Sequence, residues 1–553
     1  MRRFDFWVFS GRSDPVSGRR LYPIDGGIAF ADYHKRESNA TPIVPAPLAS
    51  HYVVPLRITA RTSAKPIVTV GTRVRKGELL GVGEGPLGVA VHAPTSGWIR
   101  ALEPFPLPHP SGLTSLSYLL EPDGADEPSE PTPFGGDPED RSAVSTFLEQ
   151  MGLVGLGGAA FPTHAKVTQP VTTLILNGAE CEPWITCDDR LMRERANEII
   201  AGARLLATAV AAREVLVAIE DNKPEAIAAM RTAAAQESAI TIVAIPTRYP
   251  AGGEKQLIQR LTGREVPYGR LPAEFGLVVV NVGTARAVYR AMVLGEPLIE
   301  RVVTLTGAAA HCGNRWVRIG HPIAELVDLM EPAPEVDHYL LGGPMTGFAL
   351  TDLDVPLLKG SNCLIAASPA LFPPPEPEQP CIRCGACALV CPARLEPMTL
   401  YWFAHADQFD KARAYHLFDC IECSCCAYVC PAHIPLVDYF RYAKSEIAAR
   451  EAEQRKAQQS RERFTFRTYR LEREKAEKAA RAAAKAAETR QRLAQAEEAT
   501  CRDVPQQESE EERKKALVEA ALAKAKARRA AASSQESLSV DAPEAPPSIG
   551  AKV

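Results

Sequence analysis

The chain lacks any run of about 18 uncharged apolar residues, the length that a membrane-spanning helix needs. Its opening residues, MRRFDFWVF, also lack the apolar core of a signal peptide. We therefore expect no membrane span and no secretory leader, so that any link to a membrane comes through partners. The chain has no large excess of either charge, with a formal net charge of -4 over 553 residues, and this gives no indication of nucleic-acid binding.

A disulfide framework is also missing. Six of the 14 cysteines are scattered without a regular spacing, which is typical of a protein kept in a reducing cytosol. These six are Cys181, Cys187, Cys312, Cys363, Cys425 and Cys501. The other eight are grouped in two short runs, which carry the most specific signal in the chain.

Two copies of one cysteine pattern lie between Cys381 and Pro431. The first reads CIRCGACALVCP and the second CIECSCCAYVCP, so each has two, two and three residues between successive cysteines and a proline after the last. Bacterial ferredoxins hold four-iron clusters with this run, because three thiolates on a tight loop can cap three irons of one cube. A more distant cysteine then closes the fourth corner.

The predicted ligand sets are crossed, because in two-cluster ferredoxins the fourth cysteine of each run ligates the other cluster. The assigned sets are Cys381, Cys384, Cys387 and Cys430 for the first cluster, and Cys420, Cys423, Cys426 and Cys391 for the second. Zinc is the alternative metal, but its tetrahedral sites usually show two separate cysteine pairs, so iron and sulfur are favoured. Cys425 lies outside the pattern and is predicted to be a buried thiol.

The first hundred residues divide into an arm and a small β domain. Residues 1–50, rich in Pro, Gly and mixed polar residues, are interpreted as an arm laid over a later domain. From 51 to 106, short alternating segments separated by glycines indicate a flattened barrel of hairpins that resembles biotinyl and lipoyl carrier domains. Those carriers need a lysine at a hairpin tip, whereas the tip here reads GEGPL (83–87). The sequence therefore predicts a docking or packing domain without a swinging arm.

Residues 107–141 are rich in Pro, Gly and acidic residues and are predicted to be a linker. From 142 to 300 apolar strands alternate with helical stretches, which predicts an α/β domain with a mostly parallel sheet. A glycine cluster opens this domain. Gly155, Gly157 and Gly158 remove the Cβ atoms that would keep backbone amides from a phosphate.

Polar groups follow several strands of the predicted α/β sheet. Lys166 can add a positive charge beside the glycines, and Glu180 and Glu182 follow the first strand, at the end where open α/β sheets bind ligands. Glu254 starts a later helix, and Asn281 ends the strand GLVVVN. Their convergence predicts a ligand site, and ordinary caps and turns are the alternative.

These elements together resemble the C subunit of the Rnf electron transport complex, also called Rsx, which is the RnfC/RsxC family. The elements that carry the resemblance are GLGGAAFPTHAK, NGAECEPWITCDDR, YPAGGEKQLIQRLTGREVP, NVGTA, GGPMTGF and the paired cysteine runs, and they cover about residues 20–445. The middle of the chain is also similar, more distantly, to the flavin-binding subunit of respiratory complex I.

The resemblance implies a multidomain fold of α/β and small β domains. Its parts are a carrier-like barrel-sandwich domain at 51–106, an FMN- and NADH-binding α/β domain at 142–300, a β-grasp-like (SLBB) unit at 301–367 and an α-helical ferredoxin domain with two 4Fe-4S clusters at 368–445. Residues 446–553 form a tail rich in Ala, Glu, Lys and Arg, predicted to be solvated helix or coil with a disordered end. His311 and Cys312 have no metal-ligand spacing with Cys363, and all three are expected in core or loop positions.

The resemblance also implies site residues for FMN and for NADH. The residues that would surround FMN are Gly155, Gly157, Gly158, Lys166, Asn177, Glu180, Glu182, Glu254 and Asn281. Phe161 and Glu182 are implied to face an incoming nicotinamide nucleotide. The chain departs from the complex I pattern at Ala160, where that motif has glycine, and at Ala179, where it has an acid. Within its own family it departs at Ser424-Cys425, where a glycine and an apolar residue are usual.

The implied function is that of a redox subunit in a membrane-bound complex that couples electron transfer to ion translocation. NADH and FMN would exchange electrons with the clusters and with partner subunits, in either direction. The implied partners are the other Rnf subunits, including integral membrane subunits and a ferredoxin-like iron-sulfur subunit. The implied location is peripheral, on the cytoplasmic side of the cell inner membrane. Two alternatives remain, a non-enzymatic electron wire with a degenerate flavin site and a soluble NADH dehydrogenase subunit of complex I or hydrogenase type.

Overall fold

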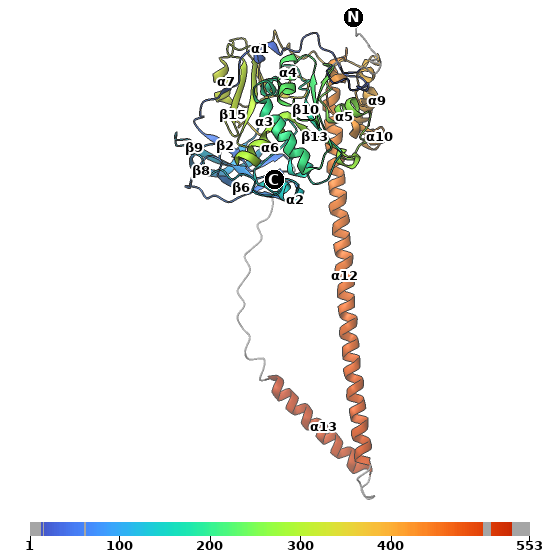
Figure 1. Cartoon of the computed structure of the whole chain (residues 1–553). Coiled ribbons are helices and arrows are strands. Elements are labelled where there is room, and N and C mark those ends of the chain that lie inside the picture. Colours follow the sequence, from blue (N-terminus) through green and yellow to red (C-terminus); the bar gives the residue numbers. More distant parts are fainter. Residues whose placement is uncertain (1–12, 15, 60–61, 502–509, 534–553) are drawn as a thin grey trace. The chain divides into compact units, whose positions relative to one another are not determined.

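The computed structural model describes residues 13–14, 16–59, 62–501 and 510–533. The expectations for the opening residues and for the last twenty lie outside the described residues. The chain divides into a compact unit, Met1–Arg450, and a second unit, Glu451–Val553. All elements that position the candidate site belong to the first unit (Figure 1).

The small β domain consists of two four-stranded sheets, ordered β2-β9-β8-β5 and β3-β4-β6-β7. Its strands are β2 Tyr52–Pro55, β3 Arg57–Thr59, β4 Thr62–Pro66, β5 Arg73–Val74, β6 Leu79–Glu84, β7 Val91–His92, β8 Gly97–Pro106 and β9 Thr114–Pro122. Apolar side chains from both sheets, among them Tyr52, Leu80, Ile99 and Tyr118, have no exposed surface and form a common core. The sheets therefore form a sandwich, as the glycine-separated segments predicted.

The linker prediction was wrong for β9, which lies inside the range 107–141 and pairs with both β2 and β8. The alternation of β9 is inverted in its first half: Ser115 and Ser117 are buried, whereas Leu116 is 43% exposed. Polar residues on the buried face of a strand hide the apolar period on which strand prediction depends.

The hairpin tip that lacks a lysine contacts the α/β part of the chain. It connects β6 to β7, and the carbonyl oxygen of Pro86 lies 3.2 Å from the Nε2 of His164. The backbone N–H of Ala90 donates to the carbonyl of Glu149 at 3.2 Å. These contacts fit a packing role for the tip.

The α/β sheet contains four parallel strands in the order β12-β11-β10-β13. The strands are β10 Thr173–Gly178, β11 Glu214–Glu220, β12 Ile240–Ile245 and β13 Leu277–Asn281. The helices α3 Cys187–Ala209, α4 Pro224–Ala233 and α6 Val282–Leu294 pack on one face. The helix α5 Glu254–Thr262 and Leu21 of the arm cover the other face. Both faces are covered, which explains the near-continuous apolar runs of these strands.

A third sheet has six strands in the order β1-β15-β14-β18-β16-β17. Its strands are β1 Val44–Pro45, β14 Glu300–Gly307, β15 Gly313–Arg318, β16 His338–Leu341, β17 Phe348–Ala349 and β18 Cys363–Ala367, and the helix α7 Ile323–Met330 packs on it. Cys363 is buried in β18, and Cys312 lies in the loop after β14, as expected for core and loop positions. Strand β1 belongs to the arm, so this sheet is completed from the N-terminal side of the chain.

The cysteine runs lie in a small helical part with its own apolar core. Its helices are α8 Ala386–Leu389, α9 Pro397–His405, α10 Phe409–Ala414, α11 Cys425–Tyr428 and the start of α12 Leu436–Cys501. The arm reaches this part too, since the backbone N–H of Gly27 donates to the carbonyl of Val390 at 2.9 Å.

Beyond Arg450, the described residues belong to the rest of α12 and to α13 Glu510–Ser533. Their side chains are exposed from Glu453 onward wherever burial is described. Pairs such as Arg470 with Glu474 and Arg473 with Glu477 lie one turn apart. The predicted solvated helix is confirmed for these residues. Over the described part of the chain, no helix has both the length and the apolar character needed to cross a bilayer.

Candidate functional site

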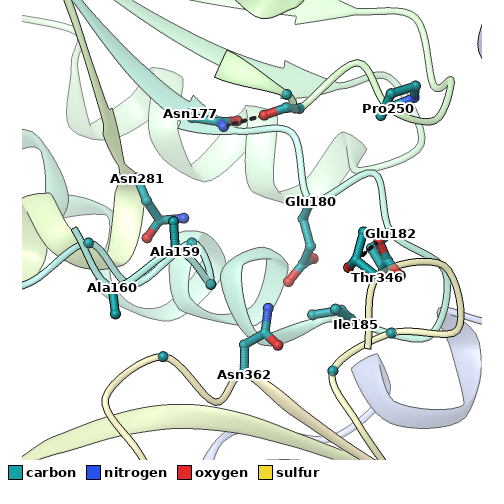
Figure 2. A pocket seen from close by; sticks show the side chains of 18 of the residues that line it. Ala159, Ala160, Asn177, Glu180, Glu182, Ile185, Pro250, Asn281, Thr346 and Asn362 are labelled. Carbon is teal, nitrogen blue, oxygen red and sulfur yellow. Dashed lines mark hydrogen bonds between the residues drawn. The ribbon is translucent and has the colours of Figure 1, made fainter. Parts of the chain in front are cut away.

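A cavity of about 890 Å³ opens at the carboxyl ends of β10 and β13. Its lining comes from the glycine cluster, the loops after these strands, the start of α5, the third sheet and the second cysteine run. All the residues predicted from the sequence to surround FMN or NADH line it, namely Gly155, Gly157, Gly158, Phe161, Lys166, Asn177, Glu180, Glu182, Glu254 and Asn281. Figure 2 shows Asn281 and Glu180 on facing sides of the space, with Asn177 and Asn362 between them on opposite walls. A volume of this size suits a nucleotide-sized ligand.

The glycine cluster forms a turn with its backbone toward the cavity. The N–H of Gly155 donates to the carbonyl of Phe161 at 2.7 Å, and the N–H of Leu156 donates to the hydroxyl of Thr284 at 2.9 Å. Gly158 has a φ of +104°, which side chains with a Cβ rarely adopt, and a Cβ placed on it would have no neighbour within 4 Å. The missing side chain therefore leaves open space beside the backbone.

Two asparagines position the loops around the cavity. The Nδ2 of Asn177 donates to the carbonyl of Gly252 at 2.8 Å, which joins the end of β10 to the loop before α5. The Oδ1 of Asn281 caps α6 by accepting from the N–H of Gly283 at 2.8 Å. Its Nδ2 donates to the carboxylate of Asp188 at 2.6 Å.

Glu180 lines the cavity and follows the end of β10 by two residues. Its carboxyl group accepts hydrogen bonds from the backbone N–H groups of Asp188 at 2.6 Å and Asp189 at 3.2 Å, at the start of α3. Burial raises the pKa of Glu180 to about 8, and the neighbouring charge of Asp188 contributes to the rise, while Lys35 opposes it. A carboxyl group with such a pKa can hold or release a proton near neutral pH.

Glu182 connects the α/β part to the third sheet. Its carboxylate accepts from the backbone N–H groups of Met345 at 2.8 Å and Thr346 at 3.0 Å, and from the hydroxyl of Thr346 at 3.1 Å. A Cβ on Gly343 would lie 2.1 Å from the side chain of Glu182, so only glycine fits there. The motif GGPMTGF is thus the loop that closes this side of the cavity.

Lys166 brings a positive charge to the cavity, but that charge already has a partner. Its ammonium donates to the carboxylate of Glu254 at 3.0 Å and to the carbonyl of Val279 at 2.7 Å. It lies 5.8 Å from the ring centroid of Phe161, which is 39% exposed. Phe161 is therefore available to contact a planar ligand at the mouth of the cavity.

The two departures from the complex I pattern have different surroundings. Ala160 lines the cavity and has a φ of +48°, a conformation that favours glycine. Ala179 is fully buried, and a Cβ on Gly252 would lie 3.3 Å from its methyl group. The cavity is formed with alanine at both positions.

Sequence reasoning missed several residues around the cavity, chiefly Lys35, Asp188, Thr346 and Asn362. Asp188 lies in the motif NGAECEPWITCDDR, so the acidic pair after its cysteine was a usable signal. Thr346 and Asn362 come from loops of the third sheet, more than a hundred residues from Glu180. Thr346 lies in the motif GGPMTGF, but the motif does not show that this residue binds Glu182, and nothing in the local pattern of Asn362 points to the cavity.

The second predicted cluster set surrounds a small enclosed space. Cys391 of the first run lies there with Cys420, Cys423 and Cys426 of the second. Cys425 also borders the space and is fully buried, as predicted for a thiol outside the pattern. Four thiols on one cavity, three from one loop and one from the other, fit the donor set of a four-iron cluster.

The first predicted set is more exposed. Cys381, Cys387 and Cys430 are partly buried against the helical core, and Cys384 is exposed. Burial raises the pKa of the Cys387 thiol. Cysteines near the surface would place a bound cluster within reach of a partner protein.

Both cysteine loops have the same backbone conformation. Arg383 and Glu422, two residues after the first cysteine of each run, have φ values of 56° and 57°. Gly385 and Ser424 occupy the next equivalent position, with φ values of 77° and 60°. Ser424 therefore takes a conformation that favours glycine, and the loop retains its shape despite this departure from the family pattern.

Cys423 borders both spaces, since it lines the large cavity as well as the small one. Its neighbour Ile421 also borders both. One cysteine of the second set thus separates the two predicted cofactor sites.

Replacing Glu180 with glutamine is expected to change how stability depends on pH. The ordinary pKa of the group is 4.5, and burial raises it to about 8 in the folded chain. The stability that its proton contributes is fully present below the unfolded value and is lost as pH rises through the folded value. Glutamine cannot titrate, so the free energy of unfolding of the variant should rise relative to that of the wild type as pH increases from 4.5 to about 8. The rise is at most ~1.4 kcal/mol for each tenfold difference in proton affinity between the folded and unfolded states. Thermal unfolding of both chains across that range measures the difference, and a constant difference would contradict it.

Three family models match separate parts of the chain. The RnfC barrel sandwich hybrid domain matches residues 22–125, the Nuo51 FMN-binding domain residues 148–290 and the 4Fe-4S dicluster domain residues 380–434. Over 454 residues, 81% of this chain, the sequence is 47% identical to the C subunit of the ion-translocating oxidoreductase complex of Salmonella gallinarum, of which it covers 67%. The chain belongs to the family of C subunits of the ion-translocating oxidoreductase complex. The family and fold class predicted from the sequence are confirmed.

Other members of this C-subunit family are equally similar to this chain and are longer than it. The relative from Salmonella dublin is also 47% identical over 454 residues, and the chain spans 64% of its length. Among solved structures, a chain of an NAD+-reducing NiFe hydrogenase in the air-oxidized state is 22% identical with a TM-score of 0.39. That likeness covers 50% of this chain and 55% of the hydrogenase chain, and it is too slight to support an inference.

Proposed function

We propose that this chain is the redox subunit through which a membrane-bound complex exchanges electrons with NADH. The residues of the cavity would hold FMN, which when bound supplies hydride exchange with NADH and single-electron exchange with iron-sulfur centres. One observation carries the proposal: the predicted FMN and NADH residues line one cavity, and Cys423, a predicted cluster ligand, lines it too. The flavin site and the nearer cluster site therefore share a wall.

The chain's own residues have distinct parts in this proposal. Gly157 and Gly158 would offer backbone amides to the phosphate of FMN, since the N–H of Gly155 already donates to Phe161, and Gly158 leaves the space for the phosphate. Asn177 and Asn281 fix the loops that flank the flavin. Phe161, exposed at the mouth, offers an apolar face to the nicotinamide ring. Glu180 can hold a proton near the reacting groups because burial raises its pKa to about 8.

The crossed cysteine sets define an order for the clusters. The set of Cys391, Cys420, Cys423 and Cys426 would hold the cluster next to the flavin, because Cys423 borders both spaces. The set of Cys381, Cys384, Cys387 and Cys430 would hold the outer cluster, because Cys384 is exposed. The two cysteine sets would hold clusters that supply single-electron exchange between the large cavity and a partner protein.

The wider role follows from the family. The relatives are named as the C subunit of an ion-translocating oxidoreductase complex, so we propose that this chain joins integral membrane subunits and a ferredoxin-like iron-sulfur subunit. Its location would be peripheral, on the cytoplasmic side of the inner membrane, and the coupled ion would move through the partners.

A second candidate function is an electron wire whose flavin site is degenerate, favoured by Ala160 and Ala179. Anaerobic reconstitution separates the two. The redox subunit should bind about one FMN and two 4Fe-4S clusters, and it should oxidise NADH with a dye as acceptor. Binding of clusters without flavin and without NADH oxidation would favour the wire. Recovery of zinc alone, or of a single cluster, would contradict both.

A further inference from the structure

A short segment of the N-terminal arm, 33–39, runs along the loop that carries Glu180 and Glu182. The backbone N–H of Trp184 in this loop donates to the carbonyl of Tyr33 at 2.9 Å. The ring of His34 stacks on the indole of Trp184, with centroids 4.2 Å apart and planes within 3°. The arm therefore packs directly behind one wall of the cavity.

Lys35 makes the central contact of this segment. Its ammonium donates to three backbone carbonyls of the loop, those of Glu180 at 2.8 Å, Glu182 at 2.7 Å and Ile185 at 2.5 Å. An ammonium group has three N–H donors, so all of its donors are used. The side chains of these three residues line the cavity, whereas their carbonyls are held from behind.

The loop needs such support because its backbone is strained. Glu180 has a φ of 49° and Trp184 a φ of 72°, and neither is glycine. Residues other than glycine are strained in this region and persist where the surroundings hold them. Without the three hydrogen bonds from Lys35, the loop can relax and carry the two glutamates with it.

A second lysine supports the same loop from the other side. The ammonium of Lys223 donates to the carbonyl of Ala179 at 2.7 Å and to the carboxylate of Glu220 at 2.9 Å. Lys223 is thus neutralised by an acid at the end of β11, whereas the three hydrogen bonds of Lys35 go to carbonyls. Burial lowers the pKa of Lys35, and the nearby charge of Lys223 lowers it further, whereas Glu180 opposes the shift.

We propose that Lys35 is a positioning residue of the nucleotide site, so that the N-terminal arm is part of the site. It holds the strained loop in the conformation in which Glu182 binds the GGPMTGF loop and Glu180 faces the cavity. This inference rests on the proposed function, because it assigns a role in binding NADH.

The experiment compares FMN-loaded wild type with Lys35→Met, Lys35→Arg and the control Arg36→Met. Arg36 is the next residue of the arm and is exposed, so its loss removes a charge without touching the loop. The measurements are amide hydrogen exchange of residues 180–189, the dissociation constant for NADH and the FMN content. Lys35→Arg retains the charge, and it carries the test if Lys35→Met does not fold.

We expect Lys35→Met to speed exchange in the loop and to weaken NADH binding by about tenfold or more, equivalent to ~1.4 kcal/mol. Lys35→Arg should weaken binding by a smaller factor, and Arg36→Met should match the wild type. Faster exchange with unchanged NADH affinity would overturn the proposal, as would variants identical to the control. Failure of the wild type itself to bind NADH would instead count against the proposed function.

Discussion

Replacing Cys430 with alanine should remove the cluster held by Cys381, Cys384 and Cys387 and leave the other cluster in place. Cys430 belongs to the second cysteine run but is predicted to ligate the cluster of the first run. Without it, that cluster has three thiolate ligands, and one of its irons has none. We expect the iron content to fall from about eight to about four atoms per chain. The reciprocal variant, Cys391→Ala, should remove the other cluster.

The two clusters can be told apart by electron paramagnetic resonance during redox titration. Cys384→Ala identifies the signal of the first cluster, and Cys420→Ala that of the second. The crossed assignment requires Cys430→Ala to lose the first signal and Cys391→Ala the second. The opposite pattern would overturn it. Cys425→Ala is the matched control, because this buried cysteine stands outside the pattern, and it should retain both signals.

Replacing Gly158 with valine should abolish flavin binding. A β-branched residue at a φ of +104° is strained, and its side chain would enter the open space beside the glycine cluster. We expect the dissociation constant for FMN to rise by more than about 100-fold, equivalent to ~2.7 kcal/mol. Fluorescence titration of the reconstituted chain with FMN measures this.

The control for backbone strain is Gly71→Val in the small β domain. Gly71 has a φ of +88°, and a Cβ there also meets no atom within 4 Å, but it does not line the cavity. The two variants should lose similar stability, and only Gly158→Val should lose FMN. Equal loss of FMN in both would show that instability, rather than the site, is responsible.

Much of the fold could be predicted from the sequence, because its signals are local. The four strands of the α/β sheet are buried on both faces and appear as apolar runs, and the cysteine spacing fixes a loop on its own. The prediction was wrong at β9, where Ser115 and Ser117 are buried and Leu116 is exposed, so the apolar period is hidden. The pairing of this strand with β2 and β8 outweighs its local pattern.

The sequence by itself determined the residue types of the site, since Glu180, Asn281 and the glycine cluster lie within recognisable motifs. Only the tertiary structure decided that Cys423 borders the same cavity, that Thr346 binds Glu182 and that Lys35 holds the loop from behind. These contacts join residues more than a hundred positions apart, and no local period or spacing encodes them. They arise because the arm, the α/β sheet, the third sheet and the cysteine loops bury their surfaces against one another at the carboxyl end of β10.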